Sequence, residues 1–237
     1  MLSTLSSKRE RPPVCSFLPI DHNYTGSRAV IALMRLPSPF KSVLFRYQEL
    51  FFMDIIQAIR NFVESECKKP ESRYGREPFL FHFAPTAEYA GRLADELGGD
   101  METVVLAAWL HDIGAIVHGR KDHHLTGAKI AEKKLKALGY PPEKIKLVKN
   151  CILRHRGSQR SRRGSLEEQI LAEADAISNF ENIPGIFKAA FVYEKLDQGR
   201  AKEAVRKKLE NKWKQLRFEK SKELIRPKYE AAMLLFR

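Results

Sequence analysis

The sequence is short of cysteine and of long apolar runs, and both shortages narrow what the protein can be. Only three cysteines occur in 237 residues, and Cys15, Cys67 and Cys151 stand far apart. That spacing argues against a disulfide framework and a cysteine zinc site, and it favours a reducing compartment. No apolar run approaches the roughly 20 residues that a membrane-spanning helix needs. We therefore expect a cytoplasmic protein with no membrane partner.

The glycine-rich phosphate loops of nucleotide-binding folds are also missing. Neither G-x-x-x-x-G-K-[ST] nor G-x-G-x-x-G occurs, so any bound phosphate has to be held by other groups. Acidic residues are in the minority, with 29 Asp and Glu against 42 Lys and Arg and a net charge of +13. This excess predicts anionic partners such as phosphorylated metabolites, nucleotides or nucleic acid. The alternative is that the charge only solvates helix faces.

Alternating strand patterns and hairpin signals are absent, whereas helical periodicity runs from Met53 onward. We predict an all-α fold in three parts. Residues 1–52 are expected to be a loosely ordered or partly helical extension, because they are rich in Ser, Pro and basic residues and Pro39 would interrupt a helix. Residues 53–196 are expected to form a helical domain, and residues 197–237 basic helices packed on it. Met53 is a candidate natural start, since an amphipathic helix begins cleanly there.

Residues that are favoured at helix starts divide the helical pattern into separate helices. The predicted starts are Pro85, Asp100, Pro142 and Ser165, the last in an S-x-x-E capping box with Glu168. Glycines after residue 97 and at residue 139 end two of these helices. The helix over residues 101–112 is expected to bury one apolar face.

Histidine and aspartate side chains fall at inward or terminal positions of these helices. His82 opens one helix, His111-Asp112 closes the next, and Asp175 points toward the core from the helix after Ser165. Burying an unpaired carboxylate costs several kcal/mol or neutralises it. A cation removes that cost, and imidazole with carboxylate suits zinc, manganese, iron or nickel. Each residue alone fits a core histidine or a helix end equally well, but together they predict a metal site.

With these residues the sequence resembles the HD superfamily of metal-dependent phosphohydrolases. The motifs are His82 in FHFAPTAEYA, His111-Asp112 in AAWLHDIGA and Asp175 in ILAEADAIS, within roughly residues 78–180. The resemblance implies a helical bundle in which these four residues ligate one divalent metal. Asp112 and Asp175 are also the candidate catalytic groups, because either carboxylate can orient the attacking water.

A subset of that superfamily binds a second metal through two further histidines and shares the HD aspartate between the ions. HHLTGA and CILRHRG match its motifs, which assigns His123 and His155 to the second ion. A one-residue shift in the alignment would exchange His123 for His124. The resemblance thus implies one or two divalent ions, whose identity stays open among manganese, iron, nickel, cobalt, magnesium and zinc.

Basic residues near these motifs are candidates for binding a substrate phosphate, because guanidinium and ammonium groups match phosphate oxygens. They are Arg120, Lys121, Arg154, Arg156 and Arg160. The alternative for residues 154–164 is a solvated loop. Residues 200–228 hold twelve Lys and Arg against four Glu, which predicts either a solvated face or a nucleic-acid-binding face.

The expected function is hydrolysis of a phosphoester by metal-activated water, with a nucleotide or another small phosphorylated metabolite as substrate. Two alternatives stay open. One is a di-iron oxygenase of the same fold, and the other is a nucleic-acid-binding module with a structural metal.

Overall fold

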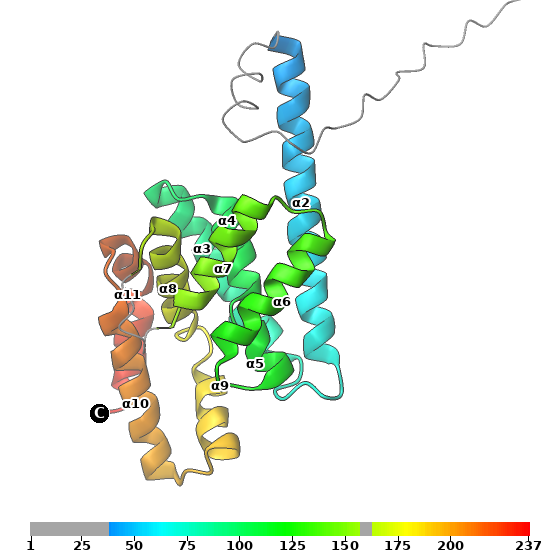
Figure 1. The fold of residues 1–237 in the computed structure, drawn as a ribbon. Helices are drawn as coiled ribbons and strands as arrows, with labels where there is room; N and C mark the ends of the chain where they lie inside the picture. The colour runs from blue at the N-terminus through cyan, green and yellow to red at the C-terminus, as the bar shows by residue number, and fades with distance from the viewer. Residues whose placement is uncertain (1–37, 157–162) are drawn as a thin grey trace, which may run out of the picture. The chain divides into compact units, whose positions relative to one another are not determined.

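The computed structural model describes residues 38–156 and 163–237, and this part of the chain is all helical, with no strand. Contacts divide the chain after Gln48, and the unit of residues 49–237 carries the candidate site. No helix within the described residues is long and apolar enough to cross a membrane. The predicted all-α class is confirmed (Figure 1). The α-helices are α2 (Ser38–Lys68), α3 (Ala84–Leu97), α4 (Met101–Leu110), α5 (Ile113–His118), α6 (His123–Ala137), α7 (Pro142–Arg154), α8 (Leu166–Ser178), α9 (Ile183–Lys188), α10 (Gln198–Gln215) and α11 (Glu219–Leu234).

Helix α2 runs without a break through Met53, so the expectation of a helix that begins there is wrong. Pro39 falls in its first turn, where the missing N–H of proline is not needed. No further proline or glycine follows before Lys68 to stop the helix. Beyond Met53, buried side chains recur every four residues, and this face joins the hydrophobic core. They are Ile55, Ile59, Val63 and Cys67.

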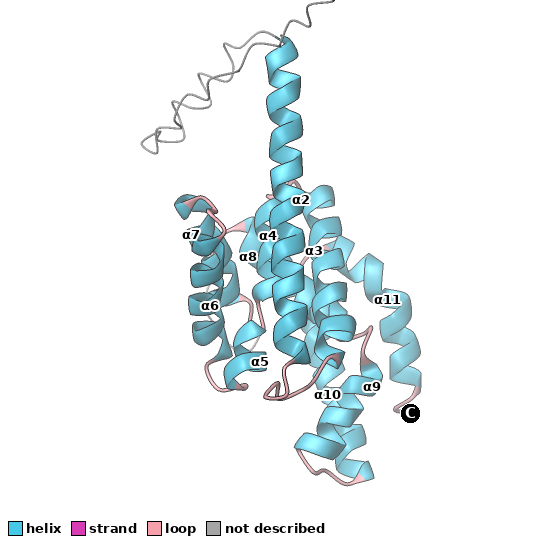
Figure 2. Cartoon of the chain, turned by 90° about the vertical axis from the view of Figure 1, so that its right-hand side faces the viewer, coloured by secondary structure: helices cyan, strands magenta, loops and turns pink. Residues whose placement is uncertain are grey.

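Helix α4 lies inside the bundle, between α3, α7 and α8 (Figure 2). The expectation of a single buried face is wrong, because residues 106–110 are all buried in succession. Such a helix has apolar side chains all round and packs against neighbours on every side. Since α4 ends within the core, the polar pair that follows it is delivered to the interior of the domain.

The predicted helix starts agree with the structure, with one difference at α8. Asp100 accepts a hydrogen bond from the amide of Thr103 at 3.3 Å, and Ser165 Oγ accepts one from the amide of Glu168 at 3.3 Å. The Glu168 carboxylate binds the amide of Gly164 at 2.6 Å and Arg154 at 2.8 Å instead of completing the capping box. A nearby cation thus competes successfully for the capping carboxylate.

Two short π-helical segments extend the pattern that the sequence predicted. Phe79–Phe83 (η1) precedes α3, and Ala189–Tyr193 (η2) follows α9. π-Helical turns are rare and often occur at functional positions. Here η1 carries His82, so the histidine lies in the wider turn that leads into α3.

The C-terminal basic segment forms two helices, as expected, and α11 continues past Lys228 to Leu234. Leu209 and Leu216 are buried, and the Trp213 ring stacks on Tyr229 with centroids 4.3 Å apart. Helix α10 lies beside α9 and also contacts α8, which carries Asp175 (Figure 1). The apolar stripe of α10 therefore brings a basic helix next to the candidate site.

Helices α5 and α6 approach each other closely at Gly114. A Cβ at this position would lie 2.2 Å from the carbonyl oxygen of His123 and 2.6 Å from the amide nitrogen of Gly127. Both are backbone atoms of α6, which cannot move without moving the helix. The glycine after the HD pair thus sets how closely His123 approaches that pair.

We predict that Gly114→Ala lowers the free energy of unfolding by about 1–3 kcal/mol, because the added methyl overpacks the contact between α5 and α6. Gly91→Ala is the matched control. Its Cβ would lie 3.5 Å from Val105 Cγ2, an ordinary contact between α3 and α4. That variant should be neutral or up to about 1 kcal/mol more stable, because alanine favours a helix interior. Denaturant unfolding of both variants checks this, and equal stability of the two would contradict the close approach.

Candidate metal centre

The HD pair lies where α4 ends and α5 begins. His111 is fully buried, and the side chain of Asp112 is 26% exposed. The Asp112 carboxylate makes no capping hydrogen bond to α5. It faces a cavity instead, so helix capping does not account for this aspartate.

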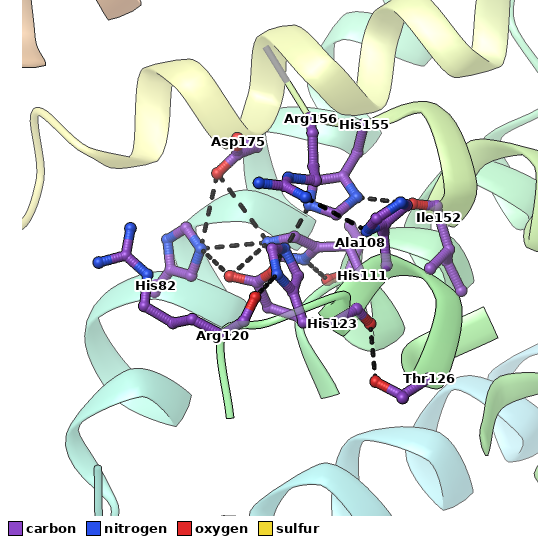
Figure 3. A network of polar contacts seen from close by, with 12 residues as sticks. His82, Ala108, His111, Arg120, His123, Thr126, Ile152, His155, Arg156 and Asp175 are labelled. Atoms are coloured by element: carbon purple, nitrogen blue, oxygen red, sulfur yellow. Dashed lines mark hydrogen bonds and ion pairs between the residues drawn. The ribbon is translucent and has the colours of Figure 1, made fainter. Parts of the chain in front are cut away.

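Four histidine rings from separate elements lie close to one another and to Asp175 (Figure 3). The Nε2 atoms of all four rings face the carboxylate of Asp112. His82 comes from η1, His111 from the end of α4, His123 from the start of α6 and His155 from the end of α7. Asp175 comes from α8. All six residues of the sequence-predicted ligand set thus lie in one place, and each is held by a helix or its end.

The two oxygens of Asp112 face two different pairs of histidines. Oδ2 lies 3.4 Å from His82 Nε2 and 3.7 Å from His111 Nε2. Oδ1 lies 3.1 Å from His123 Nε2 and 3.4 Å from His155 Nε2. Asp112 is therefore the shared member of two triads that are compact enough to hold a metal ion.

Each histidine ring is oriented by a hydrogen bond at Nδ1. The Nδ1 atoms of His111, His123 and His155 lie 2.8, 2.8 and 2.6 Å from the carbonyl oxygens of Ala108, Arg120 and Ile152. A carbonyl oxygen only accepts, so Nδ1 carries the proton in all three rings.

His82 follows the same pattern through a hydroxyl group. The Ser178 hydroxyl donates to the carbonyl oxygen of Asp175 at 2.9 Å, so its oxygen accepts from His82 Nδ1 at 3.0 Å. All four rings therefore turn Nε2 toward Asp112. Metal-binding histidines are commonly oriented in this way, with the second ring nitrogen donating to a neighbouring group.

The converging atoms fit divalent cations. His82 Nε2 and His111 Nε2 are only 3.1 Å apart, and Asp112 Oδ1 is buried without a well-directed hydrogen bond. Nitrogen lone pairs and carboxylate oxygens repel one another at such distances unless a cation lies between them. Ligands about 2.0–2.2 Å from one ion are about 3.0–3.5 Å apart, which is close to the observed spacing.

The ionisation of the HD pair suits the same role. Burial lowers the pKa of His111 to about 4, which keeps the ring neutral near pH 7. Burial raises the pKa of Asp112, but the surrounding imidazoles, His111 first, outweigh burial and hold that pKa well below its usual range. The pair thus offers a neutral nitrogen and an anionic oxygen.

The two carboxylate oxygens of Asp175 face different partners, two histidines and a lysine. Its Oδ1 lies 3.6 Å from His82 Nε2 and 4.0 Å from His111 Nε2, while Oδ2 pairs with Lys212 Nζ at 2.7 Å. Burial opposes ionisation of this carboxyl group, but Lys212 and then His82 lower its pKa below the usual range. One oxygen of Asp175 therefore stays available on the histidine side.

The structure separates His123 from His124. His123 lines the cavity and points at Asp112, whereas His124 is buried outside the cavity lining and lies 3.4 Å from an Arg156 nitrogen. Both open α6, but a helix turns about 100° per residue, so neighbours face different directions. The geometry thus favours His123 over His124.

A cavity of about 620 Å³ opens beside the two triads. Arg120, Lys121 and Arg156 line it. Arg154 is not among the residues that line this cavity, and its guanidinium binds the buried carboxylate of Glu168 at 2.8 and 3.0 Å. Arg160 lies outside the described residues.

Three residues of this site were not predicted from the sequence. Ser178 orients His82, and Lys208 and Lys212 line the cavity from α10. The spacing of the lysines could have indicated their position. Lys208 follows Val205 by three residues, and Lys212 lies three residues after Leu209 and four before Leu216. Both lysines therefore lie beside the buried stripe of α10.

The comparison with family models points to the same part of the chain. Residues 79–179 match the family model described as HD domain. The chain is 36% identical over 112 residues to ribonuclease Y of Mycoplasma capricolum, which covers 46% of this chain and 20% of that protein. Ribonuclease Y of Wolinella succinogenes is 29% identical over 156 residues, or 61% of this chain and 28% of that protein. The chain thus spans less than a third of these relatives' length.

Among solved structures, the Lin1889 protein of Listeria innocua superposes with a TM-score of 0.60 at 18% identity. The superposition covers 78% of this chain and 93% of that one, and it supports the fold alone. The likeness to HD-domain proteins rests on the HD model, whose matched residues 79–179 include His82, the HD pair and Asp175. Within those residues, which are less than half of the chain, the sequence is therefore similar to an HD domain.

Proposed function

We propose that this protein is a metal-dependent phosphohydrolase that hydrolyses a phosphoester bond of a nucleotide or another small phosphorylated metabolite. The proposal rests on the two histidine–aspartate triads, which share Asp112 and use one of its carboxylate oxygens each. His82, His111, Asp112 and Asp175 would hold one divalent ion, and His123 and His155, with the shared Asp112, would hold the second. Such ions lower the pKa of bound water toward neutrality and neutralise charge that develops on a phosphate.

The chain's own residues supply the remaining functions. Asp112 and Asp175 are ionised and would orient the attacking water through the oxygens that face the histidines. Arg120, Lys121 and Arg156 line the cavity and would bind phosphate oxygens. No serine or cysteine nucleophile is needed, and burial raises the pKa of Cys151, which makes that thiol a poor nucleophile.

A phosphodiester of RNA is a second candidate substrate. The similarity to two ribonucleases Y favours it, and the basic cavity wall suits any phosphodiester. Purified protein assayed with manganese against nucleotides, phosphomonoesters and a short oligoribonucleotide distinguishes these classes. Release of phosphate or nucleotide products supports hydrolysis. No turnover of any substrate, together with two bound irons and oxygen-dependent spectral changes, would support an oxygenase instead.

We predict that Asp112→Ala abolishes both metal binding and turnover while the protein stays folded. The substitution removes the only group shared by the two triads, so manganese content should fall below half of the wild-type value and activity by at least about 100-fold. Elemental analysis, activity and circular dichroism measure the three quantities. Asp95→Ala, which removes an exposed carboxylate of α3, is the matched control and should change neither metal content nor activity.

A second prediction separates the two adjacent histidines of α6. His123→Ala removes a ring that faces Asp112 and should lower the metal content by up to one ion per chain. His124→Ala removes a buried ring outside the cavity lining, so it should lower thermal stability but leave metal content unchanged. Elemental analysis and thermal melting compare the variants. If only His124→Ala loses metal, His124 and not His123 is the ligand.

A further inference from the structure

Helix α10 presents two lysines to the cavity, although it lies outside the matched HD residues 79–179. Lys208 and Lys212 are one turn apart, so their ammonium groups reach the same wall. The buried residues Val205 and Leu209 anchor this part of α10 on the core. The wall is thus built by packing and is not a loose surface charge.

Lys212 stands between the candidate metal ligands and the cavity. Its Nζ pairs with Asp175 Oδ2 at 2.7 Å, and its side chain is only 15% exposed. An ammonium group has three donors, and this ion pair uses one of them. The other donors are available to oxygens of a ligand in the cavity.

Lys208 lacks a counter-ion within the described residues. No carboxylate of residues 53–156 or 163–237 pairs with its ammonium group within 4 Å, and its near neighbours include Lys212 and Arg120. Burial and these like charges lower the pKa of Lys208 to about 8, against the weaker opposing effects of Asp175 and Glu194. A half-buried ammonium group held beside other cations is stabilised by a bound anion.

The third cation of the wall comes from the segment between α5 and α6. Arg120 lines the same cavity, and its guanidinium pairs with Glu194 at 3.7 Å at the exposed rim. The three cations come from two segments of the chain and line the same cavity as Asp112 and Asp175. Phosphate oxygens carry enough negative charge and enough acceptors to satisfy several such donors at once.

We propose that Lys208 and Lys212, with Arg120, form a phosphate-binding subsite on the α10 wall that holds a phosphate group of the substrate beside the metal centre. This inference rests on the proposed phosphohydrolase function and names the residues that bind its substrate. It assigns substrate binding to the segment after the HD domain, which a match to residues 79–179 does not include.

The test is calorimetric titration of inorganic phosphate into the full-length protein, once with manganese and once after chelation. Lys208→Met and Lys212→Met keep the aliphatic stems but remove the charges. Each should weaken phosphate binding by about tenfold or more in both conditions, because a charged contact is lost. Lys207→Met is the matched control. It removes the same charge from the exposed face of α10, where Lys207 pairs with Glu203, and should change the affinity less than about twofold.

Further measurements distinguish loss of the subsite from loss of the fold. Thermal melting and manganese content of Lys208→Met should equal those of wild type, and Lys208→Arg should restore most of the affinity. With a substrate found by the panel above, Lys208→Met should raise KM by about tenfold, in line with the lost charged contact.

The outcomes separate this inference from the proposed function. Phosphate binding that depends on Lys208 and Lys212, in a protein that hydrolyses nothing, would support the subsite and refute the phosphohydrolase. Turnover whose KM is the same in Lys208→Met, Lys212→Met and Lys207→Met would overturn the subsite and leave the function standing. Absence of phosphate binding by the chelated wild-type protein would also overturn it.

Discussion

The carboxylate of Asp112 is the point on which the site depends, because it divides its two oxygens between two pairs of imidazoles. The Nε2 atoms of the four rings lie 3.1–3.7 Å from these oxygens. A cation between an anionic oxygen and unprotonated nitrogens at such distances offsets their mutual repulsion. This is the physical basis for the proposal of two divalent ions with one shared ligand.

The surrounding fold holds this arrangement in place through backbone groups. Three of the four rings donate Nδ1–H to a carbonyl oxygen three residues earlier in the chain, at the end or the start of a helix. The last turn of a helix leaves C=O groups without intrahelical partners, and Ala108 and Ile152 lie in such turns, whereas Arg120 lies before the start of α6. The close approach of α5 and α6 at Gly114 then sets the distance between the HD pair and His123. The site histidines are thus positioned by helix ends, whereas many other sites are built on loops, which move more freely.

The segment after residue 179 adds two lysines to a cavity that residues 79–179 already line with positive charge. Helix α10 is basic over its whole length, but only the lysines next to its buried stripe reach the cavity. Others form ion pairs on the helix surface, such as Lys207 and Arg206 with Glu203. The basic residues of α10 therefore fall into two groups. Lys208 and Lys212 line the cavity, whereas others form ion pairs on the helix surface.

Sequence alone predicted the helical class and most helix starts, because period and capping preference are local properties of the chain. The resemblance of its motifs to the HD superfamily predicted the residues that converge, apart from the choice between His123 and His124. The sequence did not determine that α4 is buried all round or that α2 begins at Ser38, since its patterns were assessed one segment at a time. The choice between His123 and His124, the orientation of Arg154 toward Glu168 and the arrival of Lys212 at Asp175 depend on contacts between distant segments. Only tertiary packing decided these, because a one-residue step turns a side chain by about 100° and no local pattern says which neighbour it then meets.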